Sequence, residues 1–203
     1  MTTPIRATCA ATALLAFGLT HLPAQDSQQE ASQPPSKPIT SHVQRTDVGE
    51  RILIQNVWIE APIADVWDAY TTAEGWMAWA VPAADVDLRV GGTILTSYDG
   101  DLAGESVNTL RILNYVPHEV LTLKADLSAN WPEVMKQDAD NLSNVILFEE
   151  VSEDLTRIRS FGIGYGDSPE YENLMQFFIQ GNEGLFENLK RYLESGERQS
   201  WDD

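Results

Sequence analysis

The chain has 203 residues and a mass of 22.6 kDa, and 43% of its residues are apolar, which is enough for one ordinary domain with a buried core. Its 13 Lys and Arg residues stand against 31 Asp and Glu, and the formal net charge of −18 argues against a protein that binds nucleic acid by neutralising phosphates. The single cysteine, Cys9, excludes an intrachain disulfide and any metal site built from several cysteines.

The N-terminal segment has the features of a secretory signal peptide. Residues 1–24 begin with Arg6 near the terminus, continue as a small and apolar run over residues 7–19, and contain no acidic residue. The apolar run is shorter than the roughly 20 residues that a transmembrane helix needs. We therefore expect cleavage after Ala24, export to the periplasm or the extracellular space, and no stable membrane span in the mature chain. An uncleaved N-terminal anchor is the alternative.

A polar segment follows the apolar run. Residues 25–47 are rich in Gln, Ser and Pro and carry few large apolar side chains, so they cannot bury enough surface to offset the entropy lost on ordering. We expect a flexible spacer over residues 25–47, a folded domain over residues 48–196 and a short C-terminal tail over residues 197–203.

The folded domain is predicted to begin with one strand and two helices. Residues 51–61 place apolar residues among polar neighbours, which is typical of a strand. Pro62 then stands at a first helical position, and a second short helix is expected over residues 74–80. The apolar residues of the two helices are Val66, Trp67, Tyr70, Trp76, Met77 and Trp79. Their spacings in the first helix are three and four, which places an apolar stripe on one face.

Six further strands are predicted after the helices. Alternation over residues 85–90, the Gly91-Gly92 turn and the apolar residues that follow it predict a hairpin. The other four strands are expected at residues 107–116, 120–127, 145–151 and 156–165. Their short connections favour an antiparallel meander. An irregular insert over residues 128–143 interrupts it, and this insert is either a lid anchored by Trp131 or a disordered loop.

The last predicted element is a long helix over residues 169–194. Ser168 and Pro169 form a typical helix start, and Gly196 is a typical stop. The residues at helical spacing are Tyr171, Leu174, Met175, Phe178, Leu185, Leu189 and Tyr192. The order of strand, two helices, six strands and helix predicts an α+β fold, in which a curved antiparallel sheet of about seven strands wraps around the long C-terminal helix.

Several short motifs occur in an order that is more specific than any one of them. They are Ala61-Pro62-Ile63, Val66-Trp67-Asp68, Trp76 with Trp79, Arg89-Val90-Gly91-Gly92 and Gly181-Asn182-Glu183-Gly184-Leu185. Their order and separation over residues 51–195 resemble the SRPBCC, or START-like, superfamily, and within it the branch named for the activator of the heat-shock ATPase. Residues 164–170 are similar to an exported subgroup of that branch.

This resemblance implies a helix-grip fold with a pocket between the concave face of the sheet and the long helix. The superfamily uses this pocket for lipids, sterols, polyketides and other apolar molecules, and some members use it for cyclisation or hydrolysis. The fold alone does not choose among these functions.

Few residues of the mature chain have the chemistry of a catalytic or metal site. Only His42, in the spacer, and His118, in a turn, remain after cleavage. Their scarcity removes a His-based triad and the usual zinc, copper and iron ligand sets. We therefore expect neither a metal site nor a cofactor.

Two adjacent carboxylates lie on a predicted strand. Glu149 and Glu150 must point to opposite faces, so at most one can reach the pocket as a general base. The alternative is a surface carboxylate paired with Arg157 or Arg159 on the neighbouring strand. Tyrosine hydroxyls could assist at the pocket mouth. The catalytic candidates are therefore Glu149, Glu150, Tyr98 and Tyr165.

The predicted ligand-binding residues are mostly aromatic, as pocket walls usually are. They are Trp67, Trp76, Trp79, Tyr98, Phe178, Asn182 and Leu185. Core packing is the alternative role for the aromatic ones. Asn182 shares the sheet-facing stripe of the last helix, and its amide requires a partner, either protein backbone or a polar atom of a ligand. Gly181 and Gly184 disfavour a helix interior, so we expect a strand or a ligand to approach them closely.

These observations favour an exported binding protein that holds a small apolar or amphipathic molecule, such as a lipid, in the pocket. Two alternatives stay open. One is a polyketide-cyclase-like or hydratase-like enzyme that uses the same pocket. The other is an envelope protein-interaction module, for which the sequence identifies no partner.

Overall fold

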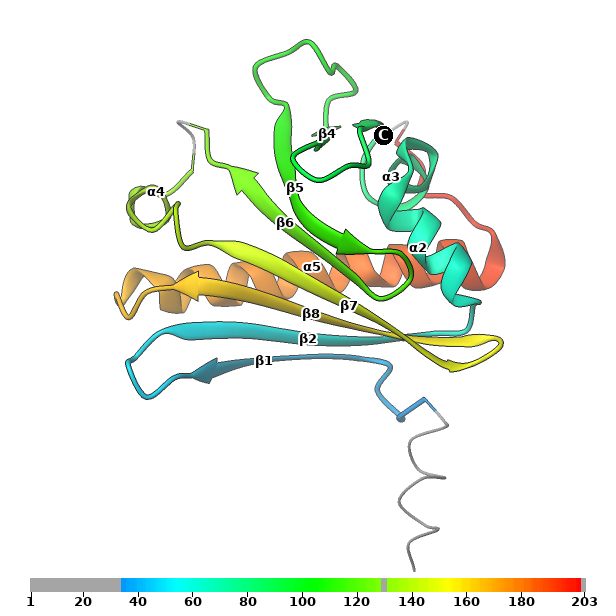
Figure 1. Cartoon of the computed structure of the whole chain (residues 1–203), viewed down its shortest axis with the longest axis horizontal. Coiled ribbons are helices and arrows are strands. Elements are labelled where there is room, and N and C mark those ends of the chain that lie inside the picture. The colour runs from blue at the N-terminus through cyan, green and yellow to red at the C-terminus, as the bar shows by residue number, and fades with distance from the viewer. Residues whose placement is uncertain (1–33, 129–130, 202–203) are drawn as a thin grey trace, which may run out of the picture.

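Eight strands form one antiparallel sheet, and a long C-terminal helix lies along one face of it (Figure 1). The computed structural model describes residues 34–128 and 131–201, so the predicted signal peptide over residues 1–24 lies outside the described residues. The predicted α+β helix-grip fold is confirmed, with one strand more than the seven expected. None of the described helices is long and apolar enough to cross a membrane.

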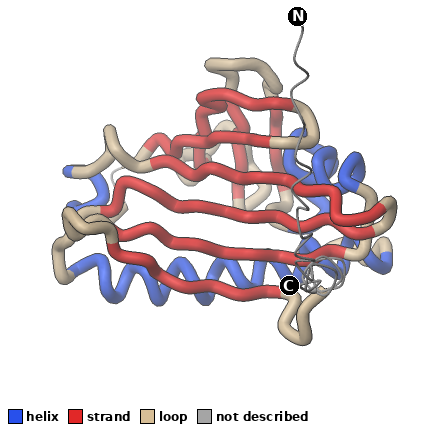
Figure 2. Tube along the Cα trace, turned by 60° about the horizontal axis from the view of Figure 1, so that its bottom comes forward, coloured by secondary structure: helices blue, strands red, loops and turns tan. Residues whose placement is uncertain are grey.

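The strands follow the chain as a meander whose first two members lie at one side. The strands are β1 (Ile39–Arg45), β2 (Arg51–Ile59), β3 (Ala83–Val86), β4 (Thr93–Ser97), β5 (Asn108–Val116), β6 (Val120–Asp126), β7 (Ser143–Ser152) and β8 (Leu155–Tyr165). The helices are α2 (Ile63–Thr71), α3 (Ala73–Trp79), α4 (Glu133–Gln137) and α5 (Glu170–Ser195). The spatial order is β1-β2-β8-β7-β6-β5-β4-β3, so the last strand pairs with β2. Figure 2 shows α5 running along the length of the strands at the β1 and β2 side of the sheet.

The folded part of the chain begins earlier than the sequence predicts. Residues 39–45, which the sequence assigns to a flexible spacer, form β1 and pair antiparallel with β2 from Ile39 opposite Val57 to Arg45 opposite Arg51. The inward-facing residue between Ile39 and Val43 is Ser41, whose hydroxyl accepts a hydrogen bond from Gln55 at 2.9 Å. A polar residue can occupy the strand interior here because its partner on β2 is also polar.

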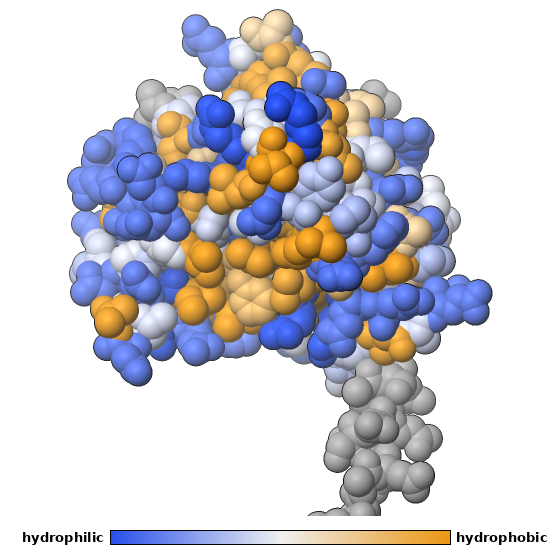
Figure 3. Space-filling model, in the orientation of Figure 1, coloured by the Kyte–Doolittle hydropathy of each residue, from blue (hydrophilic) through white to orange (hydrophobic). Residues whose placement is uncertain are grey.

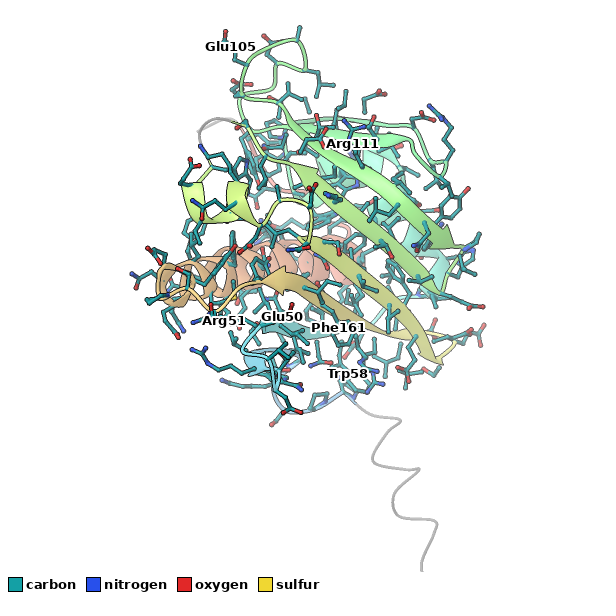
Figure 4. All side chains as sticks on the ribbon, turned by 60° about the vertical axis from the view of Figure 1, so that its left-hand side comes forward. Glu50, Arg51, Trp58, Glu105, Arg111 and Phe161 are labelled. Carbon is teal, nitrogen blue, oxygen red and sulfur yellow. The ribbon has the colours of Figure 1, made fainter. Side chains whose placement is uncertain are left out.

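The strands divide their side chains between two faces. Alternate residues of β2 are buried beneath α5, whereas Trp58 on β2 and Phe161 on β8 lie half-buried on the opposite face. The guanidinium of Arg157 lies 5.3 Å from the ring centre of Trp58, and that of Arg159 lies 5.1 Å from the ring centre of Phe161. Figure 3 looks onto this outer face and shows apolar residues gathered across it, and Figure 4 labels Trp58 and Phe161 there.

Two hydrophobic clusters fill the space between the sheet and the helices. The larger one joins α2, α3 and the C-terminal half of α5, where Phe186 and Leu189 are buried, to the middle of the sheet. The smaller one joins Tyr171 and Met175, in the N-terminal half of α5, to Met135 of α4. The predicted insert therefore contributes a short helix that packs against the start of α5.

Helix α5 begins and ends close to the predicted positions. Gly196 stops it with a left-handed φ of 74°, which other residues rarely adopt. The expectation that a strand approaches Gly181 and Gly184 closely is wrong, because a Cβ added at either glycine would meet no described residue within 4 Å. The tail beyond the helix folds back onto α3, since the backbone N–H of Gln199 donates to the carbonyl of Ala78 at 2.9 Å.

Candidate ligand-binding cavity

A cavity of about 550 Å³ lies between the concave face of the sheet and α5. Its walls come from α2, α3 and α5, from strands β4 to β8, and from the insert that carries α4. A volume of this size is within the usual range for pockets that bind small molecules and cofactors. Two exposed aromatic residues, Tyr98 at 62% and Phe177 at 67% relative exposure, mark the side on which the cavity meets solvent.

Two tryptophans of α3 form a fixed part of the wall. The rings of Trp76 and Trp79 are stacked, with centres 5.2 Å apart and planes 27° apart. The indole of Trp76 donates to the carbonyl of Tyr70 at 2.8 Å, and that of Trp79 donates to the carbonyl of Ala69 at 3.0 Å. Because both N–H groups are bonded to backbone, these rings offer a ligand apolar surface and not hydrogen bonds.

A chain of side-chain hydrogen bonds joins α5 to β2 and β1 beside the cavity. The amide nitrogen of Asn182 donates to Gln55 Oε1 at 2.8 Å, and Gln55 Nε2 donates to the hydroxyl of Ser41. The donor of the Asn182 amide is thus paired with a side chain of β2 and not with protein backbone, and its oxygen stays free for the polar atom of a ligand, which is the other predicted partner. On the neighbouring strands, the hydroxyl of Ser160 donates to Asn144 Oδ1 at 3.0 Å.

These bonds leave several polar atoms free at the cavity wall. Asn182 Oδ1, the N–H groups of Asn144 and the hydroxyl of Thr96 have no side-chain hydrogen-bond partner among the described residues. The hydroxyl of Tyr165 is likewise unpartnered in the described part of the chain, and burial raises the pKa of Tyr165 to about 12. The cavity therefore presents neutral donors and acceptors on an apolar background.

Six of the seven predicted ligand-binding residues line this cavity, and Trp67 does not. The six are Trp76, Trp79, Tyr98, Phe178, Asn182 and Leu185. Trp67 packs edge-to-face on Phe148, with ring centres 5.2 Å apart, and lies 5.7 Å from the ring of His118 in the β5–β6 turn. Tyr70, one turn later in α2, lines the cavity in its place.

The two predicted carboxylates lie outside the cavity. Glu149 is exposed and forms an ion pair with Arg157, whose Nε lies 3.0 Å from the carboxylate, and Glu150 is also exposed. This arrangement corresponds to the surface ion pair that is the alternative interpretation of the sequence. The other two catalytic candidates, Tyr98 and Tyr165, both line the cavity.

Sequence reasoning missed the polar residues of the floor. Thr96, Asn144 and Ser160 occupy inward-facing positions of strands, where apolar residues are expected. That mismatch with the alternation is the signal that could have identified them. Among residues 34–128 and 131–201, no group of three or more His, Cys, Asp or Glu residues could hold a metal ion.

Comparison with known proteins places this fold among its relatives. A family model described as "Activator of Hsp90 ATPase homolog 1-like protein" matches residues 60–194. No curated protein sequence matches the chain.

Many solved structures resemble the chain at low sequence identity. The Aha1 dimer from Colwellia psychrerythraea has a TM-score of 0.56 and 18% identity, over 71% of this chain and 97% of that chain. CalU16 from Micromonospora echinospora has a TM-score of 0.58 and 18% identity, over 80% and 88% of the two chains. Ms6760 from Mycobacterium smegmatis has a TM-score of 0.56 and 19% identity, over 79% and 100%.

At these identities the solved structures show a common fold and nothing narrower. The family model is more specific, because it spans well over half of the chain and includes α2, α3, the strands from β3 onwards and α5. The chain therefore belongs to the family of Activator of Hsp90 ATPase homolog 1-like proteins, within the SRPBCC superfamily.

Proposed function

We propose that this protein binds a small apolar or amphipathic molecule in the cavity between the sheet and α5. The observation that carries the proposal is the cavity of about 550 Å³, which has aromatic walls and unpartnered neutral polar atoms. Pockets for small molecules combine such walls with a few polar groups that orient the ligand. Each 100 Å² of apolar ligand surface removed from water would contribute about 2.5 kcal/mol before the entropic costs of binding.

A binding role accounts for the cavity better than an enzymatic one. A polyketide-cyclase-like or hydratase-like enzyme needs a group that moves a proton at the substrate. Among the described residues, the only carboxylate that lines the cavity is Asp126, and it is held by Arg111 at 2.7 Å. The cavity does contain Tyr98 and Tyr165, but neither has a base beside it to which its hydroxyl donates.

Thermal unfolding of the purified protein tests the binding proposal. A panel of 1-dodecanol, a sterol, a quinone and a tricyclic aromatic amide covers the main shapes of neutral ligand. At a ligand concentration of 100 times Kd, binding adds about 2.7 kcal/mol of stability, which corresponds to a rise in Tm of about 5 to 10 °C for a domain of this size. No rise with any member of the panel would contradict the proposal.

A cavity-filling variant makes the test specific to the site. Ala125 is half-buried and lines the cavity, whereas Ala103 is exposed in the loop after β4. We expect Ala125→Phe to abolish the ligand-induced rise in Tm, because its ring would occupy the space of the ligand. The matched variant Ala103→Phe should keep the full rise. An equal response of both variants would place binding elsewhere.

We also propose that the protein is exported. The proposal is supported by the composition of residues 1–24 alone, namely a short apolar run without acidic residues that ends in Leu22-Pro23-Ala24. The intact mass and N-terminal sequence of the protein recovered from the cell envelope or the medium test it. We expect a chain that begins at Gln25, and a chain that retains Met1 would contradict cleavage.

A further inference from the structure

The charges around the cavity restrict the ligands that it can hold. Among its lining residues in the described part of the chain there is no Lys, Arg or His, and Asp126 is the only carboxylate. The Asp126 side chain is 40% exposed and belongs to the rim, where it forms an ion pair with Arg111 on β5. The other titratable lining residues are tyrosines, which are neutral at pH 7. A ligand in the cavity thus meets no positive charge.

The free polar atoms of Asn144, Tyr165 and Asn182 lie in one region of the cavity, whereas Thr96 lies apart from them on β4. Gln55 on β2 lies opposite Ser160 on β8, and Asn144 on β7 lies opposite Gly162 on β8. A Cβ at Gly162 would lie 3.1 Å from the hydroxyl of Tyr165, so this hydroxyl projects over the same part of the sheet.

Helix α5 contributes Asn182 to this region from the side opposite the sheet. Asn182 is held there by its bond to Gln55 and keeps its carbonyl oxygen free. Asn144 offers N–H donors, Asn182 offers an acceptor, and the hydroxyl of Tyr165 can do either. Donor and acceptor side by side match a group that itself has both, such as a primary amide or an alcohol.

From this arrangement we infer that the cavity selects an uncharged ligand with a donor–acceptor group on an apolar body, and that it discriminates against the carboxylate of the same skeleton. The inference rests on the proposed binding function. A carboxylate would lose its hydration without gaining a counter-ion, and it would face the free oxygen of Asn182. The net charge of −18 adds a long-range penalty for anions.

The size of the discrimination follows from protonation. An acid can enter such a cavity as the neutral form, and with a carboxyl pKa of about 4.3 roughly 1 molecule in 500 is protonated at pH 7. The expected preference for the amide at pH 7 is therefore about 100-fold to 500-fold, and it falls to about 6-fold at pH 5. The affinity for the amide should stay constant over this range, because the amide itself does not titrate there and the lining tyrosines remain protonated.

Two matched pairs of probes test this inference on the unmodified protein. They are dodecanamide with dodecanoate, and anthracene-2-carboxamide with anthracene-2-carboxylate, titrated at pH 7 and pH 5 against tryptophan fluorescence, since Trp76, Trp79 and Trp131 line the cavity. A large preference for the amide that shrinks at pH 5 supports the inference. Carboxylate affinity within about 5-fold of the amide at pH 7 would overturn it and leave the proposed function standing. If none of the four probes bound, the proposed function itself would fail.

A variant with an added cation tests the cause of the preference. In Asn182→Lys the ammonium can still donate to Gln55, and it brings a positive charge to the floor of the cavity. We expect at least a 10-fold gain in affinity for the carboxylate at pH 7. The control is Gln180→Lys, because Gln180 is exposed on the same helix and its replacement changes the net charge equally. Equal carboxylate affinity in the two variants would refute the electrostatic explanation.

Discussion

Two glycines in the middle of α5 allow a quantitative test of the structure. Gly181 and Gly184 lie in regular helix, are exposed, and have open space where a Cβ would stand, with nothing within 4 Å. Gly is about 1 kcal/mol less favourable than Ala in a helix interior, because it loses more backbone entropy on folding. Since no contact would be disturbed, the variant Gly181→Ala/Gly184→Ala should be more stable by about 2 kcal/mol.

Urea and thermal unfolding measure this effect. For a domain of this size the gain corresponds to a rise in Tm of about 4 to 8 °C, with an unchanged m-value. Gly75 in α3 provides the opposite control, because a Cβ there would lie 2.5 Å from the carbonyl oxygen of Asp68. Gly75→Ala must therefore shift backbone and is expected to lower the Tm.

The result that would refute this reasoning is a loss of stability in the double alanine variant. It would mean that α5 needs its glycines for a conformation or a contact other than the regular helix described here. A stabilised variant that keeps its ligand affinity would show that these glycines do not serve the cavity. A stabilised variant that binds more slowly would instead show that bending at Gly181 and Gly184 admits the ligand.

Three further predictions concern single side chains. Arg51 is 2% exposed and donates to the carbonyl of Gly166, so Arg51→Ala should lower the free energy of unfolding, measured in urea, by about 2 to 3 kcal/mol. Arg45→Ala at the surface should lower it by less than about 0.5 kcal/mol. The Tyr165 hydroxyl has no hydrogen-bond partner in the described structure, so Tyr165→Phe should change the Tm of the ligand-free protein by no more than about one degree. The same variant should bind the amide probes about 3-fold to 10-fold more weakly. Unchanged affinity would show that Tyr165 does not contact the ligand. Hydrogen bonds from Ser106, Ser97 and the backbone N–H of Asp101 lower the pKa of Asp99 to about 2. The contribution of Asp99 to stability is therefore present above about pH 4 and is lost as the pH falls towards 2. An NMR titration midpoint near 4 would contradict this.

Much of the fold could be predicted because its signals are local. Alternation identifies β2 and the strands from β4 onwards, and the stripe from Tyr171 to Tyr192 identifies α5, since each depends on a period of two or 3.6 residues. The strand that was missed, β1, carries Ser41 where an apolar residue would continue the alternation. The hydroxyl of Ser41 is paired with Gln55 on the next strand, 14 positions away. A search for local periodicity considers only residues close together in the sequence, so it does not detect such a partner.

The assignment of residues to the cavity was harder than their assignment to the interior. Trp67 and Tyr70 lie three positions apart on the same face of α2, and both are buried. Yet Trp67 contacts the rings beside the β5–β6 turn, whereas Tyr70 contacts Trp76 and Trp79 and faces the cavity. Helical periodicity tells which side of a helix is buried, but it does not tell which of two interior environments receives each residue.

The cavity itself depends on small differences between distant residues. It persists because small side chains such as Ala80, Ala125 and Ser160 line it from the end of α3, from β6 and from β8, where larger ones would fill it. Their positions face one another only through the sheet register, and a shift of one residue would turn Ser160 to the outer face. Cationic side chains are absent from the described lining of β8 for the same reason, because Arg157 and Arg159 alternate with Ser160 and therefore point outwards. The proposed preference for an uncharged ligand thus depends on which positions of the strands and of α5 face the cavity, and we expect a substitution at an inward position such as Asn182 or Asn144 to change it more than one at a charged position of the surface.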